Sequence, residues 1–172
     1  MDNLGVVELL INTRGKANVE IPGMHTKESN VARVFFALWP KALVRRALHT
    51  LTTEYQSRCE ARAMRANGLH MTLLFLGEME HARLPQLMQA AGQVSVPSFE
   101  FVLERLSFWP HNRIGYAAPL AEVPALDQLI TALQQGLAAA GFPIENPEFK
   151  PHVTLLRHVG HALESQAITP IT

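Results

Sequence analysis

Apolar positions recur along this chain with two different spacings, one typical of strands and one typical of helices. Short β-rich runs or apolar–polar alternation predict strands at residues 32–38, 69–76, 99–108, 113–118 and 152–157. Apolar residues at helical spacing predict helices at residues 40–59, 80–94 and 124–140. Gly141 is placed to end the last helix, and residues 110–112 are predicted to form the turn of a hairpin.

The order of these elements indicates the fold class. A hairpin lies between strand–helix units, which favours an α+β domain over a doubly wound parallel sheet. A helix, a polar loop and a strand that opens with histidine occur twice in this order. We therefore expect two related halves within one domain, residues 31–172. Residues 1–30 are polar and mixed, so we expect an N-terminal extension that is disordered or a mis-assigned start.

Composition and charge narrow the classes of function. Of the 172 residues, 48% are hydrophobic and 17% are charged, and the formal net charge is zero, which suits a packed core. A protein that coats long nucleic acid normally has a large basic excess, so any contact should be limited to an end or a few nucleotides. The single cysteine, Cys59, excludes an intrachain disulfide and favours a reducing cytoplasm. No apolar stretch in the sequence approaches the roughly 20 residues that cross a bilayer.

One motif, a histidine and a threonine separated by one residue and followed by two leucines, occurs twice. HMTLL begins at His70 and HVTLL begins at His152. Side chains i and i+2 of a strand share a face, so His70 should lie beside Thr72 and His152 beside Thr154, while the residues between them point into a core. A single such motif is a weak signal, but two copies, each entering a strand after a loop, predict one shared site.

Two imidazoles and two hydroxyls suit the opening of a cyclic phosphodiester. That reaction needs a proton taken from the attacking water and a proton given to the departing ribose oxygen, on opposite sides of phosphorus. Histidine has an ordinary pKa near ~6.5, and each proton transfer typically contributes ~10²–10⁴ in rate. Threonine hydroxyls can donate hydrogen bonds to the charged phosphate oxygens. This set of side chains requires no metal.

Three segments, residues 33–38, 67–78 and 149–157, resemble the bacterial RNA 2′,3′-cyclic phosphodiesterase family. That family was formerly called 2′-5′ RNA ligase and belongs to the two-histidine phosphoesterases. The resemblance covers residues 31 to about 158. It implies a bilobal α+β fold with two pseudo-symmetric antiparallel sheets, flanking helices and a central cleft. It also implies hydrolysis of RNA 2′,3′-cyclic phosphate ends to 2′-phosphates, without metal or cofactor.

The resemblance assigns roles to the paired motifs. It makes His70 the general acid toward the 3′ oxygen and His152 the base that activates water, with Thr72 and Thr154 holding the phosphate. Reversing the reaction exchanges the acid and the base, so the division of roles stays open.

Further candidates for substrate binding surround the motifs, and each has a purely structural alternative. Arg157 matches the family, but regular alternation puts it on the strand face opposite His152, where it could form a surface ion pair instead. Phe35 and Phe75 could stack on a base or belong to the core. Arg65, with Arg62, could contact backbone phosphates or lie in a solvated loop.

Other functions remain open from the sequence. The chain could be a weak or inactive module that binds RNA ends or nucleotides, or it could join a 2′,3′-cyclic end to a 5′-hydroxyl by the reverse reaction; a metal hydrolase is least favoured. Expected partners are RNA 3′ ends or small cyclic nucleotides, with no membrane and no obligate protein. The family continues with further strands after residues 168–171, so we expect this chain to lack C-terminal strands and to expose a sheet edge.

Overall fold

The structure is a computed structural model that describes residues 7–12, 30–144, 148–161 and 163–172. The strands are β1 (Val7–Asn12), β2 (Val31–Leu38), β3 (Arg62–Ala63), β4 (Met71–Glu80), β5 (Leu103–Trp109), β6 (Ile114–Ala118), β7 (Val153–Arg157) and β8 (Gln166–Ile171). The helices are α1 (Ala42–Arg58), α2 (Leu84–Gly92) and α3 (Pro124–Ala139), with the short 3₁₀ helices η1 (Ala66–Gly68) and η2 (His81–Arg83).

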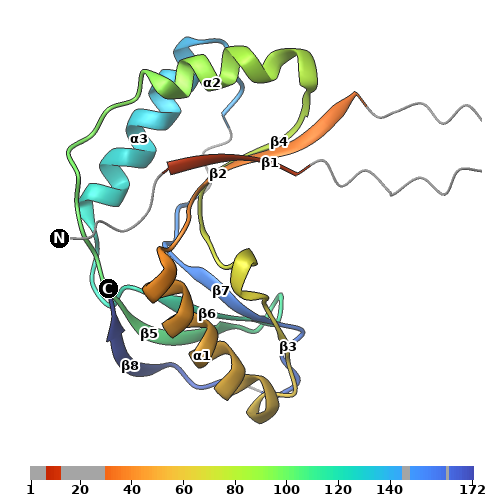
Figure 1. The fold of residues 1–172 in the computed structure, drawn as a ribbon, viewed down its shortest axis with the longest axis vertical. Coiled ribbons are helices and arrows are strands. Elements are labelled where there is room, and N and C mark those ends of the chain that lie inside the picture. The colour runs from red at the N-terminus through yellow and green to blue at the C-terminus, as the bar shows by residue number, and fades with distance from the viewer. Residues whose placement is uncertain (1–6, 13–29, 145–147, 162) are drawn as a thin grey trace, which may run out of the picture.

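The strands form two antiparallel sheets, one in each of two lobes (Figure 1). The first sheet has the order β1-β2-β4 and the second has the order β3-β7-β6-β5-β8. Helix α3 packs against β4 and against α2, whereas α1, which follows β2, packs against β7 of the second sheet. The chain therefore crosses between the lobes more than once, and the strand of each histidine motif belongs to a different sheet. The predicted α+β fold with two antiparallel sheets and flanking helices is confirmed.

The two motif strands bury the same positions. Each shows half-exposure at the first and third motif residues and burial at the second, fourth and fifth. The buried side chains of both strands join one continuous apolar core, and they include Met71, Leu73, Val153 and Leu155. The prediction that these four residues point into the core is confirmed. Burial of the apolar side chains fixes which strand face is left for histidine and threonine.

Several element boundaries differ from the sequence prediction. Strand β4 continues to Glu80, because its last residues pair with the start of β2, where Val31 lies opposite Glu80. The predicted helix over 80–94 is consequently shorter, and α2 begins at Leu84 with a proline in its first turn. Gly141 follows α3 with a positive φ of 81°, as expected for a glycine that ends a helix.

Three strands were not predicted. Strand β3 contains two residues and pairs with β7, and β8 pairs with β5 at one edge of the second sheet. Strand β1 lies within the predicted N-terminal extension and pairs antiparallel with β2 along its whole length. The other residues of that extension, apart from Asn30, lie outside the described residues. The division of the chain at residue 30 stays a prediction.

Candidate active site

The two motif histidines are held in the same way. Nδ1 of His70 lies 2.8 Å from the carbonyl oxygen of Gly68, and Nδ1 of His152 lies 2.7 Å from that of Lys150. In both motifs the carbonyl belongs to the residue two positions earlier. A carbonyl oxygen only accepts, so each Nδ1 carries the proton and donates it. Nε2 is then the nitrogen that exchanges a proton with a substrate.

The surroundings of the two histidines shift their pKa values, and His152, when it is charged, acts on His70 of the other lobe. Burial lowers the pKa of His70, the Gly68 carbonyl raises it, and the nearby charges of Arg157 and His152 lower it again. Burial also lowers the pKa of His152, against the opposing effect of the Lys150 carbonyl. Both rings are therefore mainly neutral at pH 7 in the free protein. An anion between them would favour protonation of one ring, because an opposite charge stabilises the charged form.

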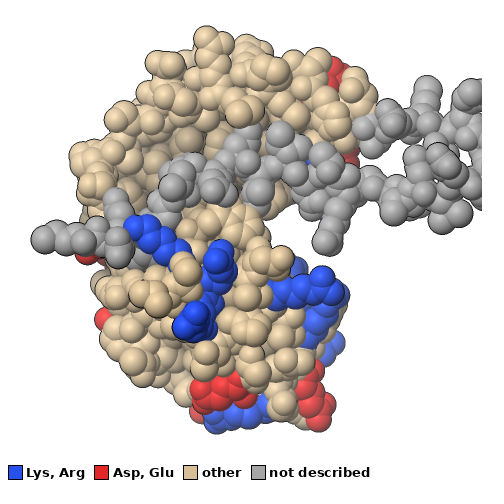
Figure 2. Space-filling view, viewed as in Figure 1, with Lys and Arg blue, Asp and Glu red and all other residues tan. Residues whose placement is uncertain are grey.

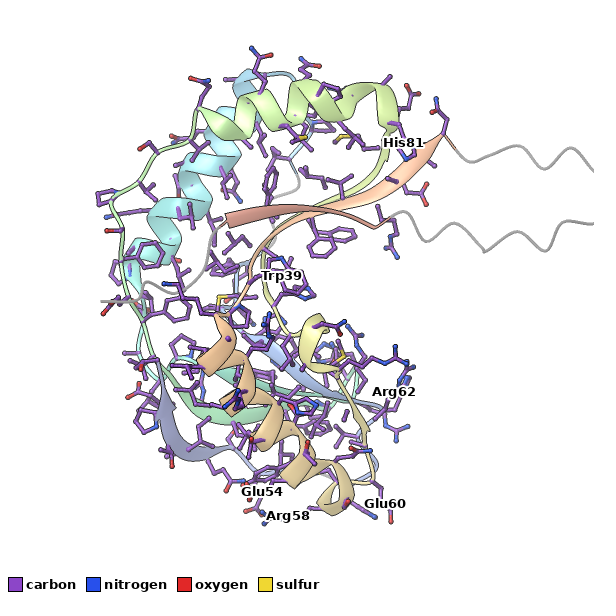
Figure 3. The ribbon with its side chains drawn as sticks, viewed as in Figure 1. Trp39, Glu54, Arg58, Glu60, Arg62 and His81 are labelled. Carbon is purple, nitrogen blue, oxygen red and sulfur yellow. The ribbon has the colours of Figure 1, made fainter. Side chains whose placement is uncertain are left out.

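Aromatic rings surround both imidazoles, and the sequence analysis missed three of them. Phe35 stacks on His70 with a centroid separation of 5.2 Å, and the Trp39 ring packs on His70 at 4.9 Å with a tilt of 38°. Figure 3 shows Trp39 where the chain passes from β2 to α1, at the junction of the lobes. This packing buries His70 and thereby contributes to its lowered pKa.

Around His152 the rings meet edge to face. Trp109 and Tyr116 have centroids 4.5 and 5.7 Å from the imidazole, at interplanar angles of 70° and 75°. One signal could have identified the two tryptophans: the sequence has only two, and each directly precedes a proline after a predicted strand. Those strand ends lie beside the two motifs.

A cavity of about 610 Å³ opens between the lobes. Residues from both motifs line it, among them Thr72 and His152, together with Phe75, Trp109, His111 and Lys150. Its size falls within the range of roughly 300–1,000 Å³ that is usual for small-molecule sites. The cleft therefore offers a nucleotide-sized space beside the imidazole of His152 and the hydroxyl of Thr72.

The structure brings three of the other predicted substrate-binding residues toward His70. Phe35 stacks on His70 and, with a centroid separation of 6.4 Å, on Phe75. Phe75 is 48% exposed, which leaves much of its ring free to meet a ligand. Arg157 is exposed at the end of β7, and its charge acts on His70. Arg65 is also exposed, directly before η1, and within the described residues its side chain forms no hydrogen bond or ion pair with the motif residues.

Two further observations concern metals and membranes. Within the described ranges, no group of three or more histidine, cysteine, aspartate or glutamate side chains is arranged to hold a metal ion. Among the described helices, none combines the length and the apolar character that a membrane crossing needs.

Comparison with known proteins gives consistent matches. The family model for LigT-like phosphoesterases matches residues 38–116. An RNA 2′,3′-cyclic phosphodiesterase of Escherichia coli (strain K12) is 30% identical over 136 residues, which are 78% of this chain and 77% of the relative. A protein of the same name from Archaeoglobus fulgidus is 25% identical over 128 residues, covering 73% of this chain and 72% of its own.

The fold matches as well. The crystal structure of E. coli LigT complexed with 3′-AMP superimposes with a TM-score of 0.69 at 29% identity, covering 81% of this chain and 79% of that one. Sequence and fold together define the class of protein as a phosphoesterase. The chain belongs to the LigT-like phosphoesterase family.

Proposed function

We propose that this protein hydrolyses the 2′,3′-cyclic phosphate at the end of an RNA to a 2′-phosphomonoester. The observation that carries the proposal is the matched pair of imidazoles, each held at Nδ1 by the carbonyl two residues earlier, with Thr72 of one motif and His152 of the other lining one cleft. The names of the curated relatives, both RNA 2′,3′-cyclic phosphodiesterases, and the complex of LigT with 3′-AMP support the choice of substrate.

The proposed reaction uses one free nitrogen from each lobe. Nε2 of His152 takes a proton from water as the water oxygen bonds to phosphorus. The bond between phosphorus and the 3′ oxygen breaks, and protonated Nε2 of His70 gives its proton to that oxygen. The product has a 2′-phosphate and a 3′-hydroxyl. Each transfer is expected to contribute ~10²–10⁴ in rate.

The mechanism requires that His70 be protonated when the 3′ oxygen departs. The pKa of this histidine is lowered in the free protein, mainly by burial and to a smaller extent by the charges of Arg157 and His152, so little imidazolium is present near pH 7. A bound cyclic phosphate places a negative charge beside both rings and raises their pKa values. Substrate binding thus favours the protonated form of His70. The positive charges of Arg157 and of His152, once it has taken a proton from water, then favour transfer of the His70 proton to the departing 3′ oxygen.

The two threonines would hold the phosphate. Thr72 and Thr154 occupy the strand positions that share a face with the two histidines, and both are half-buried. Their hydroxyls are proposed to donate to the non-bridging oxygens, which carry the charge as water adds. Hydrogen bonds to a charged group contribute roughly 1.5–3 kcal/mol each. No cofactor or metal is needed, because the imidazoles supply both proton transfers.

The nucleoside is proposed to bind on the aromatic surface beside His70. Phe75 has the exposed ring, and Phe35 stacks against it. The base would therefore stack on Phe75, and Phe35 would hold the Phe75 ring in place. Stacking of a base on an aromatic ring contributes roughly 1–3 kcal/mol. Arg157 and Arg65 would add positive charge on the substrate side. RNA 3′ ends or small cyclic nucleotides are the proposed partners, and the lone cysteine favours a cytoplasmic location.

The deciding experiment is incubation with an RNA that ends in a 2′,3′-cyclic phosphate, in the presence of EDTA. We expect complete conversion to a 2′-phosphate, identified by its phosphorus NMR signal or by resistance to enzymes specific for 3′-phosphates. A 3′-phosphate product or inhibition by EDTA contradicts the mechanism. Saturable binding without product favours the binding module. Joining to an added 5′-hydroxyl RNA in preference to hydrolysis favours the ligase.

A further inference from the structure

The turn of the β5–β6 hairpin is fastened to the loop that follows β7. Nε of Arg113 donates to the carbonyl oxygen of Val159 over 2.9 Å, and its Nη2 donates to that of His158 over 3.4 Å. The Val159 N–H donates in the other direction, to the Arg113 carbonyl oxygen, over 3.1 Å. One residue of the turn therefore holds two segments that are 45 residues apart in the chain.

The same loop is fastened to the end of α1. The N–H groups of Gly160 and His161 both donate to the carbonyl oxygen of Cys59, over 2.8 and 3.3 Å, and Cys59 is the residue that ends α1. The His161 ring also lies 3.2 Å from a carboxylate oxygen of Glu60. Through this loop, the hairpin turn is connected to the helix that packs on the second sheet.

Backbone conformations that side chains disfavour are concentrated at this contact. In the described part of the chain, the non-glycine residues with positive φ are Glu60, Arg113 and His158, at 45°, 56° and 54°. All three belong to the segments that meet here. Such conformations persist where the surrounding contacts enforce them, and they cluster at functional sites. The strain therefore indicates a role for the contact beyond closure of a hairpin.

The end of the hairpin forms part of the cleft. Trp109, His111 and Asn112 line it, and the last two belong to the turn that Arg113 completes. The His111 ring packs against Trp109 at a centroid distance of 6.4 Å, and Trp109 packs against His152 at 4.5 Å. Three rings therefore lead from the turn to His152, and a shift of the turn would move the surroundings of that imidazole.

We propose that Arg113 is a positioning residue, which fixes the turn at residues 110–113 and thereby holds Trp109 in place beside His152. The proposal rests on the proposed function and adds to it a residue that acts through another. Arg113 is not among the described residues that line the cleft, and its guanidinium donates to two carbonyls. A misplacement of ~1 Å can lower a rate by about 10²-fold, so such a contact can affect catalysis from outside the cleft.

The test replaces Arg113 with alanine, which has a β-carbon and thus the same backbone preference but lacks the donors. Acrylamide quenching measures the exposure of Trp109 in a Trp39→Phe background, where it is the only tryptophan, since the chain has two. We expect the quenching constant to rise in Arg113→Ala. With Trp39 in place, NMR titration should show a higher pKa of His152, because burial lowers that pKa and a looser indole buries the imidazole less.

Turnover of a 2′,3′-cyclic mononucleotide gives the third measurement. We expect kcat to fall by about 10–100-fold in Arg113→Ala, as for a displaced catalytic group, and KM to change less. The acid limb of the pH–rate profile should move to higher pH together with the pKa of His152. A purely structural role for Arg113 would lower the melting temperature without moving this profile.

Two variants serve as controls. Asparagine tolerates a positive φ, and His158→Asn keeps both carbonyls of the loop, so it should match the wild type. In Figure 2 the lysine and arginine side chains lie mainly over the lobe that contains α1 and β3, so the control for lost charge is taken from that lobe. Arg46→Ala removes one exposed positive charge from α1 and should also match the wild type in all three measurements.

The outcomes are distinct. Higher quenching, a raised pKa of His152 and a lower kcat in Arg113→Ala alone support the proposal. Lost activity with unchanged quenching and pKa, or wild-type values throughout, would overturn it. If circular dichroism shows that the alanine variant does not fold, Arg113→Lys takes its place; lysine can reach one carbonyl, so intermediate values support positioning and wild-type values overturn it. If the wild type hydrolyses no cyclic phosphate but quenching and pKa still shift, the proposed function fails and the positioning of Trp109 by Arg113 stands.

Discussion

Trp109 packs edge-on against His152, with ring centroids 4.5 Å apart and an angle of 70° between the planes. Burial is the largest cause of the lowered pKa of His152, and the indole supplies part of that burial. Trp109 and His152 both line the cleft, so the indole lies beside the imidazole at the space available to substrate. Its ring therefore influences both the position of His152 and the pH at which His152 gains a proton.

Replacing Trp109 with leucine should raise the pKa of His152. Water would reach the imidazole from the cleft, and the charged form would be penalised less. The acid limb of the pH–rate profile should move to higher pH, because the base must be neutral to accept a proton. NMR titration of labelled histidine measures the pKa directly. Trp39→Leu is the control, since it should shift His70 and leave His152 near its wild-type value.

Alanine at either motif histidine should reduce kcat by about 10²–10⁴, the usual contribution of one proton transfer. Because His70 and His152 are half-buried at strand starts, their loss should leave the fold intact. His49→Ala, on the exposed side of α1, should retain wild-type activity and serves as the control. Single-turnover assays on a cyclic-phosphate RNA measure the effect. Substantial hydrolysis by His70→Ala or His152→Ala would disprove the acid–base pair.

The two threonines permit a test of hydroxyl chemistry at constant shape. Valine at Thr72 or Thr154 keeps the branched side chain but removes the donor, and kcat/KM should fall by about 10–100-fold. Serine at the same positions keeps the hydroxyl and should retain most of the activity. Inhibition by inorganic phosphate should weaken in the valine variants and persist in the serine variants. A serine variant as impaired as the valine one would show that packing, not hydrogen bonding, is responsible.

Stability should depend on pH through the same two histidines. Their pKa values are lowered in the folded state, so below the ordinary value near ~6.5 the unfolded chain binds protons more readily than the folded one. Their contribution to stability is present above that pH and is lost as the pH falls. The melting temperature should therefore drop between pH 7.5 and pH 5. The drop should be smaller in the double variant His70→Ala/His152→Ala, and an unchanged drop would contradict the assignment.

The sequence predicted the parts of the fold that a repeating pattern specifies. The two HxTLL segments, with alternating apolar residues, indicated both motif strands and the face that each presents. Helices α1 and α3 followed from apolar residues at helical spacing, and Gly141 marked where α3 ends. These signals are local in the sequence, and the apolar residues that give rise to them are buried in one core.

The missed elements depend on partners that are distant in sequence. Strand β8 is largely exposed and contains Pro170, and its sequence shows no apolar alternation that would predict a strand. Its pairing with β5 determines its conformation. Residues 99–102 alternate as a strand should but do not join a sheet. Trp39, Trp109 and Tyr116 reach the histidines only through the folding of the two lobes around the cleft. The catalytic and binding roles of the site residues stay predictions.

The hydrogen bonds from Nδ1 to the preceding carbonyls have a consequence for the catalytic cycle. Since Nδ1 of each imidazole is held by a carbonyl, a proton enters and leaves each ring by the same nitrogen, Nε2. In the proposed reaction, one turnover leaves His152 charged and His70 neutral, the reverse of the starting arrangement. The free enzyme cannot begin again until His152 has lost its proton to solvent, and His70 gains its proton when the next substrate binds.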